Sequence, residues 1–227
     1  MTAGGPVPPA QDGLEAFAAL AAHQLGEAVA LMRGAASVLE DERSRLPPGA
    51  QDALRALNAG GERAQRYVDD LLDLARVSSE LELPAAAELD LALDAAAADL
   101  EPLLVKGRVE LQREPLPPAA LDPRDAQRLF THLLRSAMAA GATRMAVGGA
   151  VDAEGVSVQM LDDGTPAAEA ADPFAPFARP RGRGPLLGAG VSMAICARIV
   201  RRHGGDIATA TRPDGATVVT IRLASAA

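Results

Sequence analysis

Hydrophobic residues recur every three or four positions through two stretches at the start of the chain, and this spacing is that of one helix face. The first series consists of Leu14, Phe17, Ala21, Leu25, Ala28, Met32, Ala35 and Leu39. It predicts a helix over residues 11–45 that is ended by the prolines and the glycine at 47–49. The second series consists of Leu54, Leu57, Gly61, Ala64, Val68, Leu71 and Ala75. Two long helices with a short loop between them predict an antiparallel hairpin.

Each helix of this hairpin carries only a narrow apolar stripe, and a single partner helix leaves part of that stripe in water. Packing against a second hairpin would remove the remaining apolar surface from solvent, which favours association. We therefore expect a homodimer whose helices form one four-helix bundle.

The pattern changes after a linker that begins at Leu83 and Pro84. Beyond it, the sequence predicts helices over 90–105, 122–140 and 191–203, and strands over 108–112, 143–147, 156–161, 207–210 and 217–223. Asp122 is a suitable N-cap with Pro123 at the first helical position, and Gly204 is suited to end the last helix. Helices on one face of a small mixed sheet are the predicted architecture, which is of the α+β class.

Composition narrows the classes of function. Hydrophobic residues make up 48% of the chain and charged residues 23%, so the chain can bury a core. Aromatic residues are only 2%, which argues against base-stacking platforms for single-stranded nucleic acid. A net charge of −8 argues against DNA or an anionic membrane surface as a partner.

Cysteine usage and the lack of long apolar runs bear on location. The single cysteine, Cys196, can form no internal disulfide, and it suits a reducing cytoplasm. Residues 1–13 lack the features of a signal peptide, and no apolar run approaches the roughly 18 residues that span a bilayer. We expect a cytoplasmic chain without membrane insertion, and a disordered N-terminus over 1–13.

His23 is the first candidate for chemistry. It lies two residues from Ala21 and two from Leu25, which is about 200° around a helix from the apolar series. Its imidazole is therefore expected to face water, where it could accept a phosphoryl group. An ordinary surface histidine is the alternative interpretation.

Five further segments follow in a characteristic order. They are "DPRDAQRLFTHLLRSAMAAGA" (122–142), "VQMLDDGTP" (158–166), "PFAPFARP" (173–180), "GAGVSMAICARIV" (188–200) and "HGGDI" (203–207). In this order they resemble the boxes of two-component sensor histidine kinases. The resemblance covers residues 15–223. It implies a dimerisation and phosphoacceptor hairpin over 14–82, followed by a GHKL-type ATP-binding α/β sandwich over 83–227.

The resemblance implies that His23 is the phosphoacceptor. The next residue is usually an acid that serves as the base, but here it is Gln24, and an amide takes no proton at neutral pH. Glu27 lies four residues after His23 and shares its helix face. Our hypothesis is that Glu27 polarises the imidazole in place of the missing acid; a solvated surface carboxylate is the alternative.

The resemblance also implies a nucleotide site. Asp162 matches the aspartate that accepts a hydrogen bond from the adenine amino group, and Gly164 matches the glycine two residues later. Ser136 stands where an asparagine normally binds Mg²⁺, and a hydroxyl can serve there as a ligand. The phosphate-side glycines correspond to Gly188 and Gly190, and the ATP lid to a segment with Arg179, Arg181 and Arg183. These arginines could contact the triphosphate or belong to a solvated loop.

The predicted function is phosphoryl transfer from ATP, with Mg²⁺, to His23 and on to an aspartate of a response-regulator receiver domain. Five positions depart from the family pattern: Gln24, Ser136, Ala139, Pro166 and Ser192. These departures favour the alternative of a histidine phosphotransferase with a decayed ATP site. A further alternative is a pseudokinase scaffold that binds partners without phosphotransfer.

Overall fold

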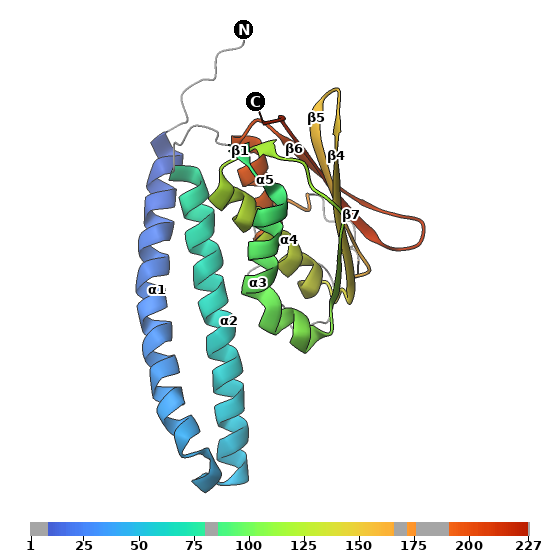
Figure 1. Cartoon of the computed structure of the whole chain (residues 1–227). Helices are drawn as coiled ribbons and strands as arrows, with labels where there is room; N and C mark the ends of the chain where they lie inside the picture. The colour runs from blue at the N-terminus through green and yellow to red at the C-terminus, as the bar shows by residue number, and fades with distance from the viewer. Residues whose placement is uncertain (1–8, 80–85, 166–171, 176–190, 227) are drawn as a thin grey trace. The chain divides into compact units, whose positions relative to one another are not determined.

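The computed structural model describes residues 9–79, 86–165, 172–175 and 191–226 (Figure 1). The chain divides into two compact units, which separate between Ser79 and Glu80. Each unit is described by itself below.

The first unit is a helical hairpin. Helix α1 spans Pro9–Asp41, a single 3₁₀ turn spans Arg43–Arg45, and helix α2 spans Pro48–Ser79 (Figure 1). Pro48 is tolerated at the start of α2 because the first backbone N–H groups of a helix have no intrahelical partner. The predicted hairpin is confirmed. Helix α1 starts at Pro9, within the stretch that we expected to be disordered, and residues 1–8 lie outside the described part of the chain.

The stripe of α1 that packs inside the chain differs from the predicted one. Ala22, Val29 and Ala36 are buried, whereas Leu25, Met32 and Leu39 of the predicted series are 53%, 51% and 46% exposed; these three residues are called the first stripe below. The predicted series is therefore not the face of α1 that is buried within one chain, since its alanines Ala28 and Ala35 are exposed as well. Small side chains face α2 because they let two helices approach closely.

That close approach is visible at two glycines. A Cβ atom at Gly26 would lie 3.3 Å from Cγ1 of Val68 on the other helix. A Cβ atom at Gly61 would lie 3.0 Å from Cγ of Arg33. Packing of α1 through Ala22, Val29 and Ala36 leaves the first stripe exposed for contacts outside the chain.

The second unit combines three helices with a mixed sheet. Its elements are β1 (Ala86–Ala87), α3 (Leu89–Gly107), β2 (Glu110–Arg113), β3 (Ala119–Ala120), α4 (Pro123–Ala139), β4 (Arg144–Asp152), β5 (Gly155–Asp162), α5 (Ser192–Arg202), β6 (Asp206–Thr211) and β7 (Thr217–Leu223). The main sheet has five strands in the order β2-β4-β5-β7-β6. Strands β2 and β4 are parallel, and the other neighbours are antiparallel.

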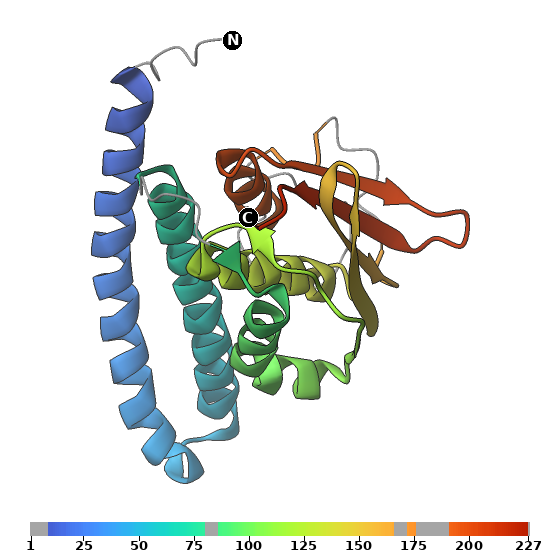
Figure 2. The same cartoon turned by 45° about the horizontal axis from the view of Figure 1, so that its top comes forward.

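Helices α3, α4 and α5 lie together on one face of this sheet (Figure 2). This arrangement confirms the predicted α+β architecture. Asp122 caps α4 as expected, since its carboxylate accepts hydrogen bonds from the backbone N–H groups of Arg124 and Asp125. At the other end of the unit, Gly204 follows α5 with a φ of 72°, a conformation that favours glycine.

The core between the sheet and the helices is aliphatic. Val156, Val158 and Met160 alternate along β5 on the buried side. They meet a helix layer whose largest buried side chains include Leu129, Phe130, Leu133, Ile195 and Ile199. Asp162 continues the β5 alternation, so this strand carries a carboxylate to the helix side at its C-terminal end.

None of the helices in the described ranges is long and apolar enough to cross a bilayer.

Candidate functional site

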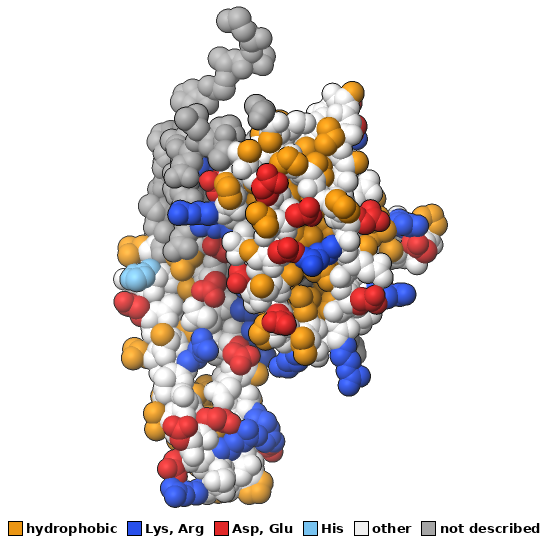
Figure 3. Space-filling view, in the orientation of Figure 1, with side chains coloured by type: hydrophobic (Ala, Val, Ile, Leu, Met, Phe, Trp, Pro, Cys, Tyr) orange, Lys and Arg blue, Asp and Glu red, His pale blue; other side chains and the backbone are white. Residues whose placement is uncertain are grey.

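His23 lies on the water-exposed side of α1, as predicted. Its side chain is 71% exposed, and the pale-blue side chain on the hairpin in Figure 3 is a histidine. The side chain of Glu27, one turn further along, is 70% exposed, and its Oε1 lies 3.6 Å from Nε2 of His23. The structure therefore brings the two predicted residues together with the imidazole open to solvent.

Asp162 occupies the C-terminal end of β5 and is only 6% exposed. Burial raises the pKa of its carboxyl, and the neighbouring Asp163 carboxylate raises it further, while a hydrogen bond from the backbone N–H of Gly164 (2.9 Å) lowers it. The net direction is upward. This is a buried acceptor group at the edge of the core, which suits it to accept a hydrogen bond from a ligand.

Gly164 allows the loop after β5 to lie against the end of α4. A Cβ atom here would lie 2.8 Å from Oδ1 of Asp162 and 2.9 Å from Cβ of Ala140, too close for any other residue. The backbone N–H of Thr165 donates to the carbonyl of Ala140 (2.9 Å). The loop over 162–165 is thus held at the C-terminal end of the helix that carries Ser136.

The α4 positions singled out in the sequence differ in accessibility. Ser136 and Ala139 are half-buried in the last two turns of α4. His132, on the same helix, is fully buried. A hydroxyl at this helix end fits a role as one oxygen ligand of Mg²⁺. Among the described residues, no group of three or more His, Cys, Asp or Glu side chains could hold a metal ion.

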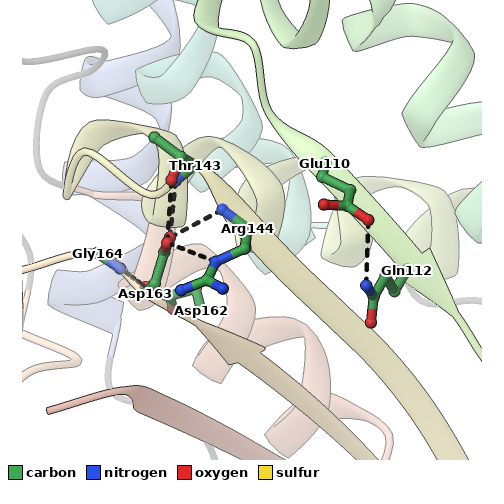
Figure 4. A network of polar contacts seen from close by, with 7 residues as sticks. All are labelled: Glu110, Gln112, Thr143, Arg144, Asp162, Asp163 and Gly164. Atoms are coloured by element: carbon green, nitrogen blue, oxygen red, sulfur yellow. Dashed lines mark hydrogen bonds and ion pairs between the residues drawn. The ribbon is translucent and has the colours of Figure 1, made fainter. Parts of the chain in front are cut away.

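The second aspartate of the loop, Asp163, is a residue that motif analysis passed over. Its Oδ1 accepts hydrogen bonds from the backbone N–H groups of Thr143 (2.7 Å) and Arg144 (2.8 Å), as Figure 4 shows. Its Oδ2 accepts from the Thr143 hydroxyl (2.9 Å) and from Nε of Arg144 (3.2 Å). These four donors, the backbone N–H of Arg144 foremost, hold the pKa of Asp163 well below its usual range.

A buried contact between a histidine and a carboxylate joins α5 to the start of α4. Nε2 of His203, at the end of α5, lies 2.9 Å from Oδ2 of Asp125 in the first turn of α4, and both side chains are 5% exposed. Burial would raise the pKa of Asp125, but the hydrogen bond and charge of His203, with Arg128 and Arg202, bring it below the ordinary value. The sequence offered no spacing that pairs these residues.

Part of the "PFAPFARP" box is also anchored to α5. The backbone N–H of Phe174 donates to the carboxylate of Asp172 (2.8 Å), and the guanidinium of Arg201 lies 5.9 Å from the centre of the Phe174 ring. The remaining predicted nucleotide-binding residues lie outside the described residues: Arg179, Arg181, Arg183, Gly188 and Gly190.

Two family models match the chain. The His Kinase A (phospho-acceptor) domain matches residues 14–80, and the Histidine kinase-, DNA gyrase B-, and HSP90-like ATPase domain matches residues 121–227. The fold is therefore a phosphoacceptor hairpin followed by an ATP-binding domain of GHKL type.

Curated relatives agree with this class. The chain is 27% identical over 219 residues to the sensor histidine kinase RcsC of Escherichia coli (91% of this chain, 23% of the relative). It is 28% identical over 214 residues to the alginate biosynthesis sensor protein KinB of Pseudomonas aeruginosa (87% of this chain, 34% of the relative). The chain thus spans between about a quarter and a third of the length of such relatives. It belongs to the two-component sensor histidine kinase family.

Solved structures show the same fold. Full-length ShkA in complex with AMPPNP superposes with a TM-score of 0.69 at 21% identity, covering 97% of this chain and 47% of ShkA. The Acinetobacter baumannii histidine kinase AdeS gives a TM-score of 0.60 at 18% identity, covering 89% of this chain and 97% of AdeS.

Proposed function

We propose that this chain transfers a phosphoryl group from ATP to His23 and then to an aspartate of a response-regulator receiver domain. The observation that carries the proposal is the open imidazole of His23 on one unit, combined with the buried carboxylate and close-packed glycine loop of Asp162 and Gly164 on the other. The first is a nucleophile in water, and the second is a preformed acceptor for an adenine amino group.

For the nucleotide, the carboxylate of Asp162 would accept the hydrogen bond from adenine, and the hydroxyl of Ser136 would be one oxygen ligand of Mg²⁺. When bound, Mg²⁺ neutralises charge on the phosphates. By the family pattern, Gly188 and Gly190 approach the phosphates, and Arg179, Arg181 and Arg183 contact the triphosphate. The similarity to full-length ShkA, whose structure is a complex with AMPPNP, supports a nucleotide as the ligand of this domain.

At His23, one ring nitrogen attacks the γ-phosphorus while the bond from that phosphorus to its bridging oxygen breaks. The proton on the other ring nitrogen is held by the carboxylate of Glu27, which lies 3.6 Å from Nε2 in the structure. Glu27 takes the place of the missing acid beside His23. Most of the catalysis then comes from positioning and from electrostatic stabilisation of the transferred group.

Two exposed apolar stripes on α1 each suggest a protein partner. A second copy of the chain covers the first stripe of α1 and forms the four-helix bundle. A second stripe consists of Leu20, Leu31 and Val38, which are 58%, 77% and 66% exposed. Its members lie about 100° around α1 from Ala21 and the first stripe, on the side of Glu27. We assign the second stripe to the receiver domain, because it borders the phosphoacceptor.

The proposed functional domains are 14–82 and 83–227, and the division of the chain at Ser79 supports a boundary in this region. A chain that uses ATP and a receiver domain belongs in the cytoplasm.

Labelling with γ-³²P-ATP and Mg²⁺ tests the proposal. Acid-labile, alkali-stable label is expected on the parent chain and on a Ser37→Ala control, which alters another exposed residue of the same helix. The label is lost in His23→Ala and slowed in Glu27→Gln. A parent that takes no label from ATP but accepts a phosphoryl group from a phosphorylated receiver would instead be a phosphotransferase.

A further inference from the structure

The carboxylate of Asp163 joins two segments that are distant in the sequence. It follows β5 directly, and its four hydrogen-bond donors belong to Thr143 and Arg144, twenty and nineteen residues earlier (Figure 4). A carboxylate that accepts hydrogen bonds from backbone N–H groups and a guanidinium forms the stronger, charge-assisted kind. Asp163 therefore fixes the loop after β5 against the start of β4.

Other contacts carry this connection to the end of α4 and into the sheet. The backbone N–H of Asp163 donates to the carbonyl of Arg144 (3.2 Å), and that of Thr165 donates to the carbonyl of Ala140 (2.9 Å). The carbonyl of Thr143 in turn accepts from the backbone N–H of Glu110 on β2 (2.8 Å). The loop is thus attached to the last residues of α4 and, through Thr143, to the edge of the sheet.

The carboxylates of Asp162 and Asp163 lie in different surroundings although the residues are adjacent in sequence. Successive side chains of a strand point to opposite faces, so Asp162 reaches the helix side while Asp163 reaches Thr143 and Arg144. The carboxylate of Asp162 accepts from Gly164 of the same loop. Its direction therefore depends on where the loop is held.

We propose that Asp163 is a positioning residue for the nucleotide, which holds the carboxylate of Asp162 in the orientation that binds the base without touching the ligand itself. This role rests on the proposed function. This role affects nucleotide binding and not phosphoryl transfer. Loss of Asp163 leaves the phosphoacceptor and the phosphate contacts unchanged and weakens binding of the adenine base.

The test compares Asp163→Ala, Asp163→Asn and Asp152→Ala by the initial rate of His23 phosphorylation over a range of ATP concentrations. Asp163→Ala removes all four acceptor contacts, and we expect its KM for ATP to rise about tenfold, or about 1.4 kcal/mol. The rate at saturating ATP stays within about twofold of the parent. Asp163→Asn retains Oδ1 for both backbone N–H groups, so its KM returns to within about threefold of the parental value.

Asp152→Ala is the matched control. Asp152 lies at the turn between β4 and β5, at the opposite end of these two strands from Asp163, where it accepts from the backbone N–H of Glu154 (2.8 Å) and pairs with Arg222. We expect a parental KM for this control. A parental KM in Asp163→Ala overturns the role, and so does a fall in saturating rate at parental KM, which is the signature of lost folded protein. Calorimetric titration with ATP separates the two proposals: a parent that binds no ATP overturns both, whereas a parent that binds ATP as tightly as Asp163→Ala overturns this role alone.

Discussion

The first stripe of α1 allows a quantitative prediction about dimerisation. Full burial of a leucine or methionine side chain stabilises by about 1.5–3 kcal/mol. Leu25 and Met32 are 53% and 51% exposed in one chain, so a second hairpin has about half of each side chain still to bury. That is about 1 kcal/mol per side chain by the same scale. Replacing both residues by serine in both copies removes about 4 kcal/mol, which weakens dimerisation about a thousandfold.

Sedimentation equilibrium over a range of chain concentrations measures the dimer dissociation constant directly. The control is the double variant Leu31→Ser, Val38→Ser, which removes a leucine and a valine side chain of even greater exposure from the second stripe. We expect this control to dimerise as the parent does. Equal weakening by the two double variants, or no weakening by Leu25→Ser with Met32→Ser, would refute the assignment of the first stripe to the dimer interface.

The remaining predictions concern Asp162, two glycines and Asp125. Asp162→Asn keeps the acceptor for the N–H of Gly164 but removes a buried charge, so we expect higher stability in urea. We also expect at least tenfold weaker ATP binding by calorimetry, since hydrogen bonds to charged groups contribute about 1.5–3 kcal/mol. In the parent, protonation of Asp162 neutralises the charged acceptor and adds an O–H group, so ATP affinity should fall as the pH drops through its raised pKa; a pH-independent affinity would count against its role. Gly34→Ala should stabilise the chain by about 1 kcal/mol, because a Cβ there meets nothing within 4 Å, and Gly204→Ala should destabilise it because of its φ of 72°. Asp125→Ala leaves His203 buried without its carboxylate and should destabilise by about 3 kcal/mol. The Asp125 contribution is present above pH 3.8 and is lost as the pH falls through its lowered pKa, so the two urea midpoints should converge in acid.

The long helices and the strands of the main sheet could be predicted because their signals are local, whereas the two-residue strands β1 and β3 were not predicted. Asp122 with Pro123 marks the start of α4, and Gly204 marks the end of α5, where a residue with positive φ is needed. Periodicity could not decide which apolar face of α1 meets α2. Ala22 and Leu25 both belong to apolar series, and only the close approach of the helices, seen at Gly26, selects the smaller side chains for the contact inside the chain.

The exposure of His23 was predictable from its position relative to the apolar series of α1, whereas Asp162 was identified only through the resemblance of its motif to the family. The side-chain contacts that the sequence did not predict depend on long-range pairing. Asp163 meets Thr143 across 20 residues, and His203 meets Asp125 across 78. No spacing in one sequence relates such residues, because the fold determines which of the many polar side chains become neighbours.

Mass spectrometry of the ATP-treated chain tests the central claim most directly. The chain is incubated with ATP and Mg²⁺, digested at neutral to alkaline pH, and the mass of each peptide is measured before and after acid treatment. The account predicts one added phosphoryl group on the peptide that contains His23, which disappears in acid and is absent when Asp162 is replaced by alanine. A phosphoryl group found on another residue, or a His23 peptide of unchanged mass under conditions in which the chain binds ATP, would contradict it.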